Sequence, residues 1–180
     1  EWCYCNYKRY DDGTAYPVAT EFDDDYKTSD AVDVGAMQMS FYWNWDASNP
    51  QYDLVTISDS PNEKYGLKPW TESVKADGTV LPYCIGSAYF SGTASDGFLR
   101  SQPNLRPENF QSHNNMITNY SKKGKGYCGA GAERQTFQVL FNIIKGATKN
   151  SQTLYYGCTK YNFQYPASVQ SSESHTYFPV

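Results

Sequence analysis

The side chains best able to do chemistry in this chain are its cysteines and histidines, and their spacing keeps them apart. Cys3 and Cys5 alternate along an expected strand, so both point to one face. The remaining cysteines are isolated in the sequence: Cys84, Cys128 and Cys158. A zinc site needs closely spaced ligands, whereas His113 and His175 lie far apart. We therefore expect buried free thiols, as in a protein assembled in a reducing cytoplasm, and no metal site.

Carboxylates are concentrated in residues 21–35. Five aspartates share this stretch: Asp23, Asp24, Asp25, Asp30 and Asp33. A calcium loop is one interpretation, but the glycine and the closing glutamate of an EF-hand are absent at the required spacing. We predict a solvated loop instead.

Glycine-rich stretches at 124–126 and 129–131 precede an expected helix, which is where a phosphate-binding loop would lie. Neither has Walker or dinucleotide-binding spacing, so we predict plain turns. The adjacent basic run, Lys122, Lys123 and Lys125, is predicted to be a solvated helix end. The net charge is −4, which argues against a broad nucleic-acid-binding face.

No nucleophile–base pair or paired carboxylates stand at a recognisable spacing, so we predict a protein that is not an enzyme and holds no cofactor. Seventeen tyrosines accompany nine phenylalanines. Tyrosine suits exposed contact surfaces and also suits β-sheet, and composition leaves both uses open. No apolar run reaches the length of a membrane span, so we expect no membrane insertion.

One long segment, 133–152, has a clear helical period. Four apolar residues at i, i+3, i+4 and i+7 share a face: Phe137, Leu140, Phe141 and Ile144. Val139 and Ile143 widen this stripe, so we expect the helix to be covered on well over one side. A shorter helix is predicted over 110–120, with Ser112 as its N-cap.

Strands are predicted before the helices. Residues 1–20 resemble a hairpin with its turn at 11–13, and 36–59 resemble a second hairpin in which alternate residues from Met37 to Trp45 form one strand. Strands followed by consecutive helices predict an α+β fold rather than α/β. We divide the chain into an N-terminal hairpin and acidic loop, 1–35, and a main domain, 36–180.

The order of several segments carries a resemblance to a known family. These are FYW at 41–43, ISD at 57–59, LPYCIGSAY at 81–89, DGFLRS at 96–101, KGKGY at 123–127, and a helix through 138–152. This order resembles the C-type-lectin-like proteins of tailed phages and prophages of gut Gram-positive bacteria. It is also similar to the formylglycine-generating-enzyme branch of that fold. The resemblance covers most of 36–165.

The resemblance implies a virion-surface or tail domain that recognises a host-cell glycan or protein, contacts other virion subunits and forms a homo-oligomer. It also implies that the family's later half, which closes the fold, is missing from this chain. Our candidate ligand-binding residues follow the second helix: Tyr155, Tyr156, Tyr161, Asn162 and Tyr165. These residues equally suit strand and core positions.

Two alternatives stay open at this point. The chain could be a structural virion component of the tail, baseplate or capsid decoration, whose aromatic surface contacts other subunits. It could also be an enzyme, of the formylglycine-generating type or a polymer depolymerase. A depolymerase would need Asp23 to Asp25 or Glu72 to meet in a cleft.

Overall fold

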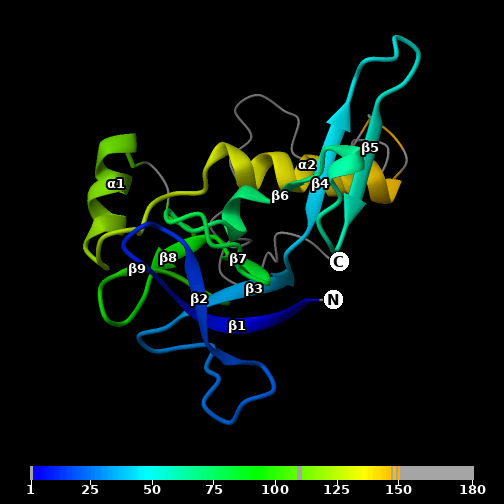
Figure 1. Cartoon of the computed structure of the whole chain (residues 1–180). Helices are drawn as coiled ribbons and strands as arrows, with labels where there is room; N and C mark the ends of the chain where they lie inside the picture. The colour runs from blue at the N-terminus through cyan, green and yellow to red at the C-terminus, as the bar shows by residue number, and fades with distance from the viewer. Residues whose placement is uncertain (1, 109–110, 147, 149, 151–180) are drawn as a thin grey trace.

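The structure of this protein is a computed structural model that describes residues 2–108, 111–146, 148 and 150. It is an α+β fold of antiparallel sheets and two helices, as predicted (Figure 1). The C-type-lectin-like topology stays a prediction.

The largest sheet has four antiparallel strands. In spatial order they are β2 (Ala15–Thr20), β1 (Trp2–Arg9), β3 (Asp33–Met39) and β7 (Tyr83–Ser87). The predicted N-terminal hairpin forms β1 and β2, and Gly13 adopts φ 89° at its turn, a value that only glycine adopts readily. Because β1 also pairs with β3, this hairpin shares a sheet with later segments.

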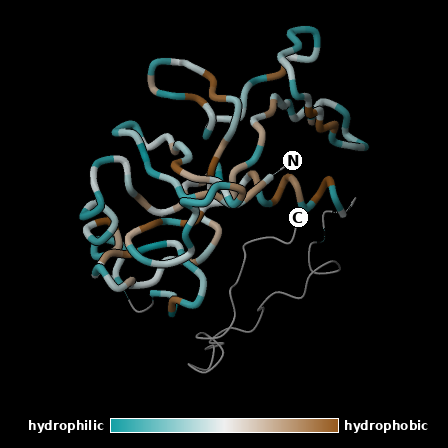
Figure 2. The backbone as a smooth tube through the Cα atoms, turned by 90° about the horizontal axis from the view of Figure 1, so that it is seen from below, coloured by the Kyte–Doolittle hydropathy of each residue, from teal (hydrophilic) through white to brown (hydrophobic). Residues whose placement is uncertain are grey.

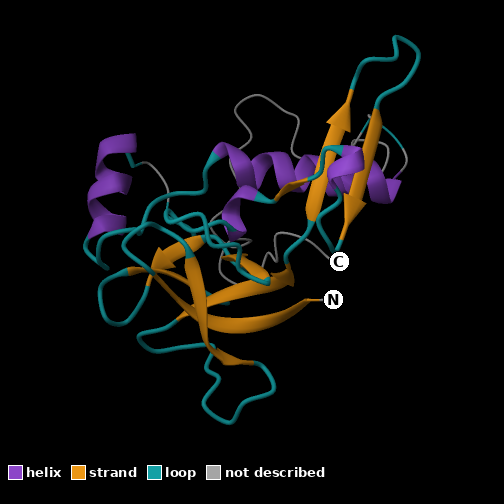
Figure 3. Ribbon diagram, in the orientation of Figure 1, coloured by secondary structure: helices purple, strands orange, loops and turns teal. Residues whose placement is uncertain are grey.

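A second sheet is separate. Its strands are β5 (Leu54–Ser58), β4 (Tyr42–Asp46) and β6 (Lys68–Pro69). We had predicted one continuous strand from Met37 to Trp45, and this is wrong, because the chain leaves the first sheet at Ser40 and Phe41. The Ser40 N–H donates to Pro82 O at 2.9 Å, and Phe41 O accepts from the Trp70 N–H at 2.9 Å. The predicted hairpin between β4 and β5 is confirmed and projects from the molecule (Figure 3).

The remaining elements are short, apart from the last helix. They are the 3-10 turns η1 (Glu63–Tyr65) and η2 (Thr71–Ser73), the hairpin of β8 (Ser91–Thr93) and β9 (Leu99–Ser101), α1 (His113–Ser121) and α2 (Ala132–Gly146). The Ser112 hydroxyl caps α1 by accepting from the Asn115 N–H at 3.2 Å, as predicted.

Two buried clusters lie on opposite faces of β7, because neighbouring residues in a strand point to opposite sides. Ile85 joins the first cluster with Cys5, Tyr7 and Ala15. Its neighbour Cys84 joins the second cluster, whose other members are Phe41, Trp70 and Phe137. The second cluster fastens α2 to β7 and to the start of β4.

The apolar stripe of α2 is only half covered. Phe137 and Leu140 are buried as predicted, but Phe141 and Ile144 are 37% and 44% exposed and Val139 is 55% exposed. Our expectation of wide coverage is therefore wrong for the described part of the chain. The hydrophobic residues along α2 stand out in Figure 2.

Candidate functional site

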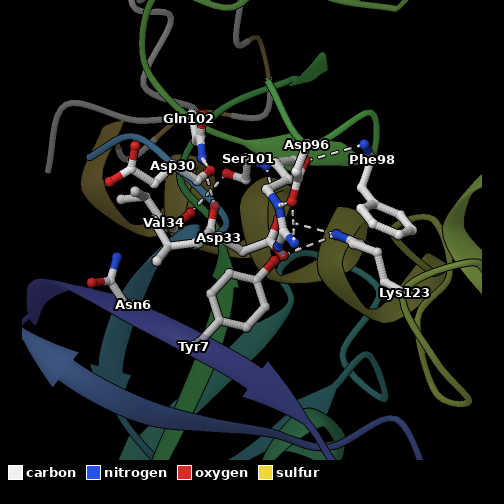
Figure 4. Close-up of polar contacts among 12 residues, drawn as sticks. Asn6, Tyr7, Asp30, Asp33, Val34, Asp96, Phe98, Ser101, Gln102 and Lys123 are labelled. Carbon is white, nitrogen blue, oxygen red and sulfur yellow. Dashed lines mark hydrogen bonds and ion pairs between the residues drawn. The ribbon is translucent and has the colours of Figure 1, made fainter. Parts of the chain in front are cut away.

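A buried carboxylate, Asp33 at the start of β3, organises the polar interior. Its side chain is 2% exposed and accepts from the Ser101 N–H at 2.9 Å. The Lys123 ammonium lies 3.0 Å from both carboxylate oxygens, and Arg100 Nη1 lies 3.2 Å from one of them. Figure 4 shows Asp33, Ser101 and Lys123 converging from β3, β9 and the segment that follows α1. Two cations and a backbone donor therefore satisfy a charge that burial alone would make costly.

The network corrects two of our predictions. The sequence predicts a solvated acidic loop for Asp33 and a solvated helix end for Lys123, yet their side chains are only 2% and 6% exposed. Burial lowers the pKa of Lys123, and the Asp33 carboxylate opposes this by favouring the ammonium form. Since the two side chains lie 3.0 Å apart and Arg100 also contacts Asp33, we describe them as a charged pair.

Further polar contacts stiffen this part of the molecule. Arg100 also pairs with Asp96 at 2.7 Å, and this hydrogen bond holds the pKa of Asp96 below its usual value. The Ser101 hydroxyl donates to Val34 O at 2.7 Å. The Gln102 amide donates to the carbonyls of Asp30 and Val32 at 2.7 and 2.8 Å. The segment 99–102 is thereby fixed to the start of β3.

A cavity of about 200 Å³, which we call the helix cavity, lies beside this network. Aromatic rings line it: Tyr89 and Phe90 lie just after β7, Tyr120 lies in α1, and Tyr127 lies after α1. The amides of Gln135 and Gln138 on α2 face it together with Glu108. This mixture of rings and a few polar groups is typical of a site that binds a small polar ligand.

An ion pair between α2 and η2 supports the wall of the helix cavity. Arg134 Nη2 lies 2.8 Å from Glu72 Oε2, and the Trp70 indole N–H also reaches that oxygen at 3.3 Å. Gly86 on β7 leaves room for the guanidinium, since a Cβ at this position would lie 2.5 Å from Arg134 Cζ. Glu72, which we had considered as a depolymerase carboxylate, is therefore held by an arginine.

A second and larger cavity, about 520 Å³, lies across the Asp33 network from the first. Five residues line both cavities: Tyr7, Arg9, Asp33, Lys123 and Tyr127. We call this second space the basic cavity, because six of its lining residues are lysines or arginines. The Asp33 network thus forms a partition between the two.

The cysteines that the structure describes differ in their exposure to solvent. Cys3, Cys5, Cys84 and Cys128 are free. Burial raises the pKa of Cys5 to about 12 and that of Cys84 to about 11, so both stay protonated at neutral pH. The prediction of buried thiols is wrong for Cys128, which is exposed and lines the helix cavity.

The five candidate ligand-binding residues, Tyr155, Tyr156, Tyr161, Asn162 and Tyr165, lie outside the described residues. Sequence reasoning missed the residues that the structure brings together instead. Asp33 and Lys123 are 90 positions apart, and the KGKGY segment that contains Lys123 does not indicate Asp33 as its partner. The only usable signal was the position of Lys123 directly before Gly124, a residue that adopts φ 132° where the chain turns.

Comparisons with protein-family models, with curated proteins and with solved structures found no match to this chain. Among the described residues, no helix is long and apolar enough to cross a membrane.

Proposed function

We propose that this chain is a non-enzymatic recognition domain of a phage or prophage virion, which binds a glycan or protein ligand on the host-cell surface. The observation that carries the proposal is the helix cavity, in which aromatic rings and amides surround a small space and four of the charged lining residues, Asp33, Lys123, Glu72 and Arg134, form ion pairs. The order of segments that resembles C-type-lectin-like phage proteins supports the same role.

The chemistry of the helix cavity suits a sugar. Tyrosine rings offer flat apolar faces to the C–H surfaces of a pyranose, and a tyrosine hydroxyl is a hydrogen-bonding group that matches the hydroxyls of a sugar. Gln135 and Gln138 each provide a donor and an acceptor in one amide, which matches the hydroxyl groups of a saccharide.

The pairing of charges suits binding more than general acid–base catalysis. A catalytic acid or base must be able to gain or lose a proton near the working pH. Asp33 is surrounded by two cations, and Glu72 is held by Arg134. These pairs occupy both carboxylates and keep the cavity wall in one shape, which lowers the entropic cost of binding.

The test is binding by the purified chain to an array of bacterial surface glycans and to envelope fractions of Gram-positive gut bacteria. We expect the double variant Gln135→Ala and Gln138→Ala to lose binding by about tenfold or more, which corresponds to about 1.4 kcal/mol. Alanine favours the helix, so the fold should be kept. Asn142→Ala, an amide change on the same helix one turn beyond the residues that line the cavity, is the matched control. Binding to nothing on either panel, or equal binding by the double variant, would overturn the proposal.

A structural virion role is the second candidate, favoured by exposed apolar side chains. On α2 these are Val139, Phe141 and Ile144, and on the β4–β5 hairpin they are Trp45, Leu54 and Ile57. Subunit interfaces bury side chains of this kind. If this role holds, the chain self-associates with rising concentration in light scattering, and Val139→Glu abolishes association while glycan binding is unchanged.

A further inference from the structure

The basic cavity has a charge opposite to that of the protein as a whole. Six basic residues line it: Lys8, Arg9, Arg100, Lys122, Lys123 and Lys125. Only two acidic residues do so, Asp11 and Asp33, although the chain carries a net charge of −4. Positive charge is therefore concentrated in one hollow, and a concave wall strengthens its field.

Most of this positive charge is not neutralised inside the protein. Asp33 is committed to Arg100 and Lys123. Arg9 donates to the Gly13 carbonyl at 2.6 Å, and Lys122 donates to the Asn119 side chain at 2.8 Å, both neutral acceptors. Across the part of the chain that the structure describes, Lys8 and Lys125 form no salt bridge within 4.0 Å.

The loop that carries the lysines, residues 122–127, is fixed from two sides. Lys123 is anchored on Asp33, and its ammonium lies 4.7 Å from the centre of the Tyr127 ring. On the other side Gly126, at φ 89°, approaches the β1–β2 turn so closely that a Cβ would collide with the Tyr10 carbonyl oxygen. The backbone that presents Lys122 and Lys125 is therefore held in place before any ligand arrives.

Aromatic residues stand among these cations. Tyr16, Phe98 and Tyr127 line the same cavity. Cations alone would suit any anion, but rings beside them also suit the apolar face of a sugar. We propose that the basic cavity binds an anionic saccharide through its phosphate or carboxylate group. The inference names a ligand class for the proposed recognition function and rests on it for its biological meaning, whereas the binding itself can be measured separately.

The experiment is calorimetry on the whole chain at low salt with three probes: glucose 6-phosphate, glucuronate and glucose. We expect the two anionic sugars to bind and glucose not to bind at the same concentrations, with affinity falling as salt is added. The relative affinities of the two anionic sugars show whether phosphate or carboxylate is preferred. Binding of neither, or equal binding of glucose, would overturn the proposal.

Variants locate the site. The double variant Lys8→Gln and Lys125→Gln should weaken anionic-sugar binding about tenfold or more. The double variant Lys68→Gln and Lys145→Gln removes an equal number of positive charges from exposed positions outside the cavity. It should bind as the wild type does. If both double variants lose affinity equally, net charge rather than the cavity is responsible and the proposal fails.

Two further probes sharpen the outcome. Inorganic phosphate that binds as tightly as glucose 6-phosphate would show that the rings contribute nothing, which would overturn the saccharide assignment. A single-stranded oligonucleotide that binds more tightly than both sugars, and depends on Lys8 and Lys125, would replace it with a nucleic-acid surface. The variant with Gln135→Ala and Gln138→Ala shows which cavity is used. If it still binds glucose 6-phosphate, the binding site is the basic cavity and not the helix cavity. Failure of the glycan and envelope test would then remove only the proposed function.

Discussion

The Lys123 ammonium, two residues beyond the end of α1, lies 3.0 Å from both carboxylate oxygens of Asp33, at the start of β3. None of the nine α1 residues is buried, so no fully buried side chain holds this helix on the sheet. The ion pair between Asp33 and Lys123 therefore helps to hold α1 in place, a role that buried apolar side chains have in most helices.

The first prediction concerns this pair. Asp33→Asn leaves Lys123 buried without a counter-charge and leaves Arg100 with Asp96 alone, so we expect the free energy of unfolding to fall by about 3–5 kcal/mol. Urea denaturation followed by circular dichroism measures it. Asp30→Asn is the control, since that side chain is 70% exposed and asparagine tolerates its φ of 69°. A loss below about 1 kcal/mol for Asp33→Asn would show that the pair does not stabilise the fold.

The second prediction concerns the space that Gly86 leaves for Arg134. Gly86→Ala should push the guanidinium away from Glu72 and destabilise the protein by about 1–3 kcal/mol. Adding Arg134→Ala removes the obstructed group, so the double variant should lose less than the sum of the two single losses. Gly129→Ala, whose Cβ would meet only Tyr120 at 4.0 Å, should change little. Strictly additive losses would contradict the steric explanation.

The third prediction concerns the aromatic cluster around Trp70. The Trp70 ring is 2% exposed, and its centre lies 5.2 Å from that of Phe41 and 5.4 Å from that of Phe137. We expect Trp70→Ala to cost about 3–5 kcal/mol, because it opens a cavity between β4, β7 and α2. Trp45→Ala removes a ring that is 39% exposed and should cost about 1 kcal/mol or less. Thermal unfolding of both variants compares them, and similar losses would argue against the packing described for α2.

The fourth prediction concerns alkaline pH. Burial raises the pKa of Tyr7 to about 12 from 10.0, although its hydrogen bond to Ser87 at 2.9 Å acts in the opposite direction. Between pH 10 and 12 the unfolded chain loses this proton while the folded chain keeps it, so stability falls as pH rises. Tyr7→Phe should lose about 1 kcal/mol at pH 7 through the missing hydrogen bond. Above pH 10 the stability of Tyr7→Phe should decline less steeply than that of the wild type. The two slopes should differ by about 1.4 kcal/mol per pH unit.

Urea midpoints at pH 8, 10 and 11 give these slopes for the wild type and for Tyr7→Phe. Tyr52→Phe is the control, because that ring is 60% exposed. Parallel curves for the wild type and Tyr7→Phe would mean that Tyr7 does not contribute to the alkaline loss of stability.

Local features of the fold were predictable from the sequence. Ser112 caps α1, and Gly13 takes φ of 89° at the predicted turn at 11–13. Each depends on the chemistry of a few neighbouring residues, as does the pairing of β4 with β5. The antiparallel α+β class followed from the order of such segments.

The candidate site was not predictable, because it depends on distant partners. The charge of Asp33 indicates a solvated loop. Its burial is possible because Arg100 and Lys123, both more than 60 positions away, offset the cost of burying the charge. Likewise the alternation from Met37 to Trp45 fits one strand. The bend at Phe41 arises because its ring packs on Trp70 and Phe137, which no local pattern reveals.

The β4–β5 hairpin extends away from the rest of the described molecule, and its connection, residues 47–53, is mostly exposed (Figure 1). Neither cavity includes any residue of this connection. A peptide tag or fluorescent label inserted there would extend into solvent and leave both cavities untouched. The hairpin is thus a natural handle for fixing the domain to a surface, with the sites of both proposals open to ligands in solution.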